Sequence, residues 1–245
     1  MSNGIIGFIL GVIVTLGLSS FTAQAQTEST LTLDPARTSV VYGPIEGRGA
    51  AVLVKALSKV TEGEYTLLID SPGGVVSAGL RVMQTMRLVQ GRGVKIRCVV
   101  TGAAYSMADY ILTECDTRYA LPTATILWHP IRIFAMGVMT GPDAVRLANA
   151  LNRYEAPLLK RAQERRPMNP AAYKRHWKNE SMHFPEQINA LSPGWITVVE
   201  NVVGVPVTLL QAITTEAELL DKLRKSNRAV PVLIYSPWFN PIGKP

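Results

Sequence analysis

The stretch "VKIRCVVTGAAYSMADYILTE", residues 94–114, decides the fold because a buried strand passes almost directly into a helix. Residues 94–102 form a mostly apolar run without alternation, which is typical of a strand inside a parallel sheet. Residues 106–114 have a helical composition, and Ser106 stands at their first position. A hydroxyl group at this position is either a helix cap or a nucleophile, and the rest of the chain bears on that choice.

Strands and helices are expected to alternate on both sides of this stretch. Further strands are expected at 39–43, 65–70, 118–122, 125–129 and 194–202, and helices at 48–60, 75–90, 141–166 and 185–191. The alternation predicts an α/β fold with a parallel-stranded core sheet. The chain has 245 residues, of which 47% are hydrophobic and 18% charged, enough for one large domain with a substantial core.

The two ends of the chain differ from this domain, which is expected over residues 38–203. Residues 1–25 carry no charged side chain, and Ala23 and Ala25 occupy the A-x-A positions of a signal-peptidase site. A signal peptide is therefore expected, with an uncleaved membrane anchor over residues 4–21 as the alternative. Either segment would place the folded part in the periplasm or another extracytoplasmic space. Residues 26–37 resemble a polar linker, and residues 204–245 form an extension to which the sequence assigns no role.

Export would permit a disulfide bond, and the chain has two cysteines. Cys98 lies on the strand before Ser106, and Cys115 lies where the following helix is expected to end. The strand leads away from this region and the helix leads back, so the two thiols could meet. Two buried free thiols are the alternative.

The formal net charge is +7, and much of the excess lies in residues 160–178. Only Tyr173 and Trp177 accompany these charges, too few aromatic side chains for a nucleic-acid site. A solvated helix face is expected here, and contact with anionic lipid head groups is the alternative.

Two loops follow two buried strands, "DSPGG" at 70–74 and "TGAAYS" at 101–106. In a parallel sheet both loops emerge at the carboxyl edge, where ligand sites gather. Glycines let backbone N–H groups approach a substrate, and a helix N-terminus favours developing negative charge. The amides of Gly74 and Met107 could therefore form an oxyanion hole beside Ser106. His129, His176 and His183 are the histidines that could serve as a base, but the sequence alone favours a surface or core role for each of them.

Four motifs occur in a recognisable order: "VVYGPIEGRGAAVLVKAL", "LLIDSPGGVVSAGLRVMQTM", "TGAAYSMADYIL" and "RYALPTATILWHP". They resemble the proteolytic subunit of the Clp protease, within the crotonase-like fold, over about two-thirds of the chain from Thr38 to Glu200. The resemblance implies a ClpP/crotonase-like fold with a long helical handle. It makes Ser106 the nucleophile, His129 its general base, and Gly74 and Met107 the oxyanion donors. It implies a peptide or protein substrate and a homo-oligomer, with no cofactor and no metal.

The chain departs from the family pattern at three places, one of which is the short segment "TECDT" before "RYALP", where the family usually has a longer glycine-rich turn. Asp70 replaces the usual asparagine, where we expect it to accept loop N–H bonds. The triad acid, normally an aspartate, should fall near "KNESMHFPE", residues 178–186. Glu180 is the candidate there, with Asn179 the weaker one, and a capping or surface role for Glu180 is the alternative.

The expected function is an exported or membrane-tethered serine peptidase that works by acyl transfer. A catalytically silent scaffold of the same fold is one alternative. A Ser/Lys dyad of the signal peptide peptidase type is another, with Lys160 and Lys174 as its lysines. Acyl-CoA chemistry, which the fold also hosts, is disfavoured by the Ser/His pair. No nucleic-acid partner is expected, and an ATP-driven unfoldase is not expected outside the cytoplasm.

Overall fold

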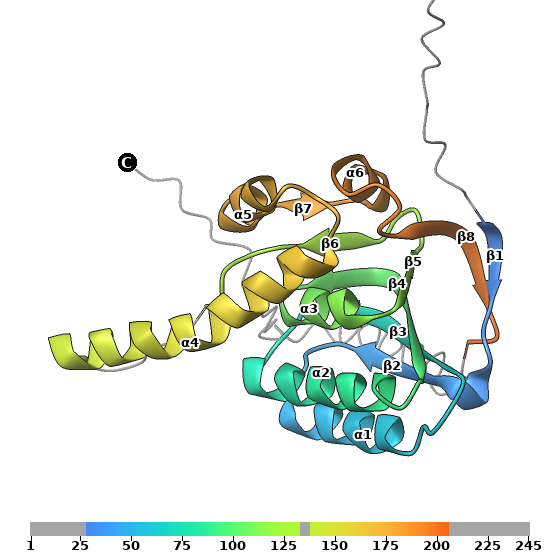
Figure 1. Cartoon of the computed structure of the whole chain (residues 1–245), viewed down its shortest axis with the longest axis horizontal. Coiled ribbons are helices and arrows are strands. Elements are labelled where there is room, and N and C mark those ends of the chain that lie inside the picture. The colour runs from blue at the N-terminus through green and yellow to red at the C-terminus, as the bar shows by residue number, and fades with distance from the viewer. Residues whose placement is uncertain (1–27, 133–137, 206–245) are drawn as a thin grey trace, which may run out of the picture.

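The computed structural model describes residues 28–132 and 138–205. A sheet with the strand order β1-β8-β5-β4-β3-β2 forms its centre, and the strands along this path pair in parallel (Figure 1). β6 pairs in parallel with the last three residues of β4, Ala103–Tyr105, and β7 pairs with β6 in antiparallel orientation. The α/β fold with a mostly parallel sheet is confirmed.

The strands are β1 (Glu28–Thr32), β2 (Thr38–Tyr42), β3 (Glu64–Ser71), β4 (Lys95–Tyr105), β5 (Thr117–Ala120), β6 (Thr125–Leu127), β7 (Met182–His183) and β8 (Thr197–Val203). The helices are the 3-10 helix η1 (Pro35–Arg37), α1 (Gly47–Ser58), α2 (Val76–Gln90), α3 (Met107–Glu114), α4 (Gly141–Arg165), α5 (Pro170–Lys178) and α6 (Pro185–Leu191).

The sheet is buried on both faces, which explains why its central strands read as continuous apolar runs. In β3, Leu67 and Ile69 face the main core, where α1, α2 and α3 pack. Leu68 between them faces a smaller cluster on the other side, formed with Leu31, Leu33, Val99 and Val199. Successive strand residues point to opposite faces, so these two clusters follow from the strand geometry.

The expectation of a linker over residues 26–37 is wrong for residues 28–37, the part of this segment that the structure describes. Residues 28–32 form β1, which pairs with β8, and η1 follows directly. Leu31 and Leu33 are 7% and 4% exposed and supply the anchoring contacts. The polar composition hid this strand, because threonine and serine fit an outer strand while alternate leucines reach the core. Residues 1–25 and 206–245, on which the signal peptide, the anchor and most of the extension fall, lie outside the described residues.

The solvated basic face expected over residues 160–178 is only partly present. Arg165 donates hydrogen bonds to the carbonyl oxygens of Thr113, Glu114 and Cys115 at the carboxyl end of α3. Arg166 is buried and pairs with Asp109 on the same helix. Arg165 satisfies the last carbonyls of α3 and complements its dipole. Arg166 holds the first turn of the same helix through the Asp109 side chain, so part of the basic run anchors the helix that begins beside Ser106.

Cys98 and Cys115 form a disulfide bond with their Cα atoms 5.9 Å apart. It joins β4, which leads into Ser106, to the residue that ends α3. Of the two alternatives that the sequence left open, the bridge is therefore the one present, and it links the strand before Ser106 covalently to the end of the following helix. Within residues 28–132 and 138–205, no helix is both long and apolar enough to cross a membrane.

Candidate active site

Ser106 lies at the sharp turn between β4 and α3, with φ 56° and ψ −120°. A positive φ is costly for a residue with a Cβ atom, so the surrounding structure must hold this turn. The backbone does so through Ser106 N, which donates to Leu127 O at 3.1 Å, and Ser106 O, which accepts from Asp109 and Tyr110. The Ser106 side chain makes no capping hydrogen bond. Of the two roles that the sequence left open, the helix cap is therefore excluded.

The glycine loop packs directly against this turn. An ideal Cβ atom at Gly73 would lie 2.6 Å from Tyr105 O and 2.7 Å from Ser106 Cβ. Gly73 also has φ +90°, in the left-handed region that favours glycine. Only glycine at this position allows the loop to approach the serine so closely.

The backbone of the loop presents Gly74 to the site. Ile45 N donates to Gly73 O at 2.8 Å, and Val75 N donates to Ile45 O at 2.9 Å. Because neighbouring peptide groups of an extended chain point to opposite edges, the N–H and C=O of Gly74 face away from Ile45. Met107 is the first residue of α3, so its N–H has no acceptor within the helix. Two backbone donors thus lie close to Ser106.

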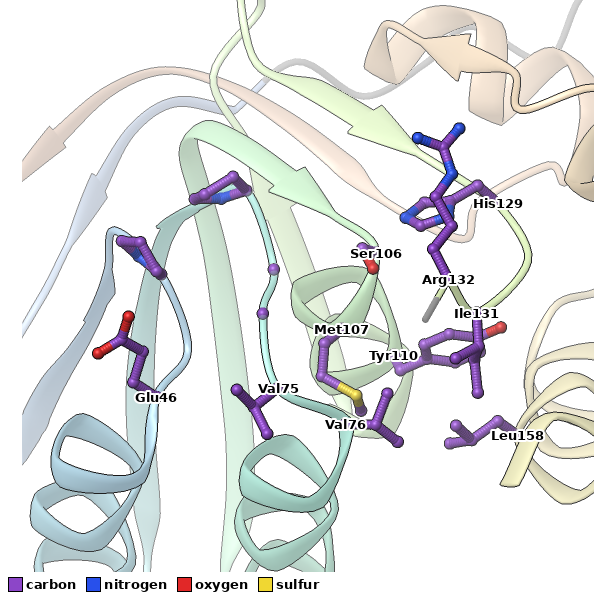
Figure 2. Close-up of a pocket in the computed structure, with 14 residues that line it drawn as sticks. Glu46, Val75, Val76, Ser106, Met107, Tyr110, His129, Ile131, Arg132 and Leu158 are labelled. Carbon is purple, nitrogen blue, oxygen red and sulfur yellow. The ribbon is translucent and has the colours of Figure 1, made fainter. Parts of the chain in front are cut away.

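A cavity of about 550 Å³ brings the predicted residues together, and its lining includes Ser106, Gly74, Met107 and His129. Figure 2 shows Ser106 at the start of α3 and His129, from the segment after β6, on facing sides of this cavity. The other walls are largely apolar, from Val75, Val76, Tyr110, Ile131 and Leu158.

The surroundings of His129 favour the neutral form of its imidazole. Its ring Nδ1 lies 2.5 Å from Pro130 O, and a carbonyl oxygen can only accept, so Nδ1 carries the proton and Nε2 has the lone pair. Burial lowers the pKa of His129, and the charge of Arg132 adds to this. The hydrogen bond to Pro130 and the charge of Glu180 act in the opposite direction. At neutral pH the imidazole can therefore take up a proton.

Glu180 lies close enough to influence the charge of His129, but its carboxylate is engaged in an ion pair with Arg132. The acceptor at His129 Nδ1 is a main-chain carbonyl. Asn179 is the C-cap residue of α5, and its N–H donates to Arg175 O. The structure thus brings together the serine, the histidine and both amides, and places the predicted acid next to Arg132.

The remaining candidates lie elsewhere. Lys160 and Lys174 are exposed, and neither lines the cavity of Ser106. Asp70 accepts the N–H of Ala103 in β4 at 2.9 Å rather than one in its own loop. His183 and His176 pack together with ring centroids 5.0 Å apart. Among the described residues, no group of three or more His, Cys, Asp and Glu side chains could hold a metal ion.

A parallel-sheet α/β fold with a serine at a strand–helix turn, a histidine across a cavity and converging backbone donors has the construction of a serine hydrolase. The family model of Clp protease matches residues 24–172. The chain therefore belongs to the Clp protease family, which implies a serine-type peptidase that acts on peptide substrates and typically assembles into oligomers.

Proposed function

We propose that Ser106 is the nucleophile of this peptidase and that His129 is its general base. The observation that carries the proposal is the strained position of Ser106. Its φ of 56° persists although its hydroxyl caps nothing, while the buried His129 lines the same cavity. Strain of this kind at a residue whose side chain makes no capping hydrogen bond supports a functional role.

In the proposed reaction His129 Nε2 takes the proton from Ser106 Oγ as that oxygen attacks the substrate carbonyl carbon. The amides of Gly74 and Met107 donate to the developing oxyanion, and each donor of this kind is typically worth about 10²–10³ in rate. His129 then gives its proton to the leaving amine. Water next attacks the carbonyl carbon of the acyl-enzyme and gives a proton to His129 Nε2, which passes it to Ser106 Oγ as the ester bond breaks. The hydrogen bond from His129 Nδ1 to Pro130 O fixes the tautomer that these proton transfers require.

The substrate is proposed to lie extended along the glycine loop. Ile45 occupies one edge of Gly73–Val75, so the opposite edge, with the N–H and C=O of Gly74, is the one that a peptide strand can pair with. The apolar walls of the cavity favour an apolar substrate side chain next to the scissile bond. Glu180 enters the proposal through its charge, which favours the protonated form of His129.

We also propose an extracytoplasmic location, either free or tethered to a membrane. The disulfide bond between Cys98 and Cys115 supports an oxidising compartment, and the uncharged apolar N-terminal sequence supports export. A homo-oligomer without an ATP-driven unfoldase is the proposed assembly. We propose that anionic lipid head groups would contact the exposed cationic side chains of α5, Lys174, Arg175 and Lys178.

A catalytically silent scaffold is the second candidate, favoured by the carbonyl that stands at His129 Nδ1 where a triad carboxylate would be expected. A fluorescent fluorophosphonate, which labels activated serines, separates the two. The proposal predicts labelling of the wild type, none of Ser106→Ala, and strongly slowed labelling of His129→Ala. Ser58→Ala, which changes an exposed serine of α1, serves as the control and should label normally. Absence of labelling in every form would favour the scaffold, and normal labelling of His129→Ala would require another base.

A further inference from the structure

The peptide group between Pro130 and Ile131 has a hydrogen-bond partner on each side. Its carbonyl oxygen lies 2.5 Å from His129 Nδ1. Its N–H, which belongs to Ile131, donates to Glu155 Oε1 at 2.8 Å. A single planar unit thus stands between the imidazole and a carboxylate.

We propose that Glu155 is the positioning residue for His129 and acts on it through this peptide group. The inference rests on the proposed function, in which His129 is the base. In a triad the acid holds the imidazole in one tautomer and orientation and stabilises the imidazolium that forms. Here the Pro130 carbonyl performs the first task directly, and Glu155 fixes and polarises the peptide that carries it. Hydrogen bonds in a chain strengthen one another, so the carboxylate makes Pro130 O a better acceptor.

The surroundings of Glu155 suit this role. It is half-buried, and no cationic side chain among residues 28–132 and 138–205 forms an ion pair with it beside its bond to Ile131 N–H. It lies on α4 three residues before Leu158, and residues at this spacing share a helix face. Leu158 lines the cavity of Ser106, so α4 brings that face to the site.

The helix that carries Glu155 is firmly attached to the helix that begins beside Ser106. The carboxyl half of α4 is tied to α3 through Arg161, which pairs with the buried Glu114, and through Arg165 on the last carbonyls of α3. Since α3 begins beside Ser106, the nucleophile and Glu155 rest on two helices that are joined to each other. Glu180 lacks this connection to Nδ1, because its carboxylate pairs with Arg132 at a partly exposed position.

Saturation kinetics of fluorophosphonate labelling test the inference, since they separate the rate of the chemical step from the affinity for the probe. Losing a hydrogen bond to a charged group predicts that Glu155→Ala slows the chemical step about ten- to a hundredfold with unchanged probe affinity. Glu155→Gln keeps an acceptor without the charge and should lose roughly three- to tenfold. Glu164→Ala, on the exposed side of the same helix, is the matched control and should match the wild type. Glu180→Gln should lose less than Glu155→Ala.

The outcomes separate this inference from the proposed function. A wild type that does not label contradicts the proposed function itself. A wild type that labels, with Glu155→Ala as fast as Glu164→Ala, overturns only the role of Glu155. A large loss of labelling rate in Glu180→Gln, together with a wild-type rate in Glu155→Ala, would indicate that Glu180 is the triad acid. If Glu155→Ala does not fold, Glu155→Gln decides, and a wild-type rate there would also overturn the inference.

Discussion

Replacing Gly73 by alanine tests whether the close approach of the glycine loop sets the position of Ser106. The added Cβ atom would lie 2.6 Å from Tyr105 O, whereas ordinary contact begins at 3.4 Å. The loop and the serine turn must therefore separate by roughly 0.8 Å, the difference between those distances. A misplacement of about 1 Å can cost about 10² in rate, so we expect labelling of Ser106 to slow about a hundredfold.

Stability should fall as well. The left-handed backbone at Gly73 costs an alanine about 1–2 kcal/mol, and overpacking adds about 1–3 kcal/mol, so the free energy of unfolding should drop by about 2–5 kcal/mol. Gly194→Ala is the matched control, because Gly194 has φ +71° with no atom within 4 Å of the added Cβ. It should lose only the backbone part of that stability and keep its labelling rate. Denaturant unfolding and fluorophosphonate kinetics give both quantities, and a Gly73→Ala variant with wild-type values would refute the reasoning.

Three further predictions concern the rest of the domain. Removing the disulfide with Cys98→Ala and Cys115→Ala opens a loop of sequence separation 17. The loss should be about 3 kcal/mol by chain entropy, or roughly 6–12 °C in Tm by calorimetry. Burial and the charges of His176 and Arg166 lower the pKa of His183 to about 4. As pH drops, the imidazole of His183 is protonated in the unfolded chain before it is protonated in the folded one. The free energy of unfolding should therefore fall by about 3 kcal/mol between about pH 6.5 and about pH 4. Gly49→Ala, in α1 with open space around it, should raise stability by about 0.5–1 kcal/mol.

Each of these predictions has a clear contrary result. An unchanged Tm in the cysteine double variant, measured against the oxidised wild type, would mean that the bridge does not contribute to stability. His183→Phe should flatten the pH dependence of the unfolding free energy, and an unaltered slope would assign that dependence to other groups. A less stable Gly49→Ala would show that the site is more crowded than its surroundings indicate.

Much of the fold could be predicted because burial on both faces leaves a direct mark on the sequence. The apolar runs of β3 and β4 and the periodicity of α1 and α2 carry that mark. The sequence around β1 carries no such mark, because only Leu31 and Leu33 of this segment reach the core. β7 has only two residues, too few for any pattern.

The site divides in the same way. The serine and its two amide donors follow from local rules, because a strand–helix turn and a glycine pair have recognisable sequences. The choice of His129 among the three histidines came from the resemblance of the "RYALPTATILWHP" motif to the family, because its position in the sequence alone did not single it out. The role of the arginines after residue 160 was missed, because inward and outward arginines on a helix look alike in the sequence. Glu155 lies 26 residues beyond His129 in the chain, and only tertiary packing brings its carboxylate to Ile131 N.

An experimental structure of the protein after reaction with a fluorophosphonate would test the central claim most directly. We expect the phosphorus atom bonded to Ser106 Oγ, its free oxygen within hydrogen-bond distance of Gly74 N and Met107 N, and His129 Nε2 facing the modified oxygen. A phosphonate on another residue, or on Ser106 with its oxygen turned away from both amides and the imidazole remote, would contradict the account.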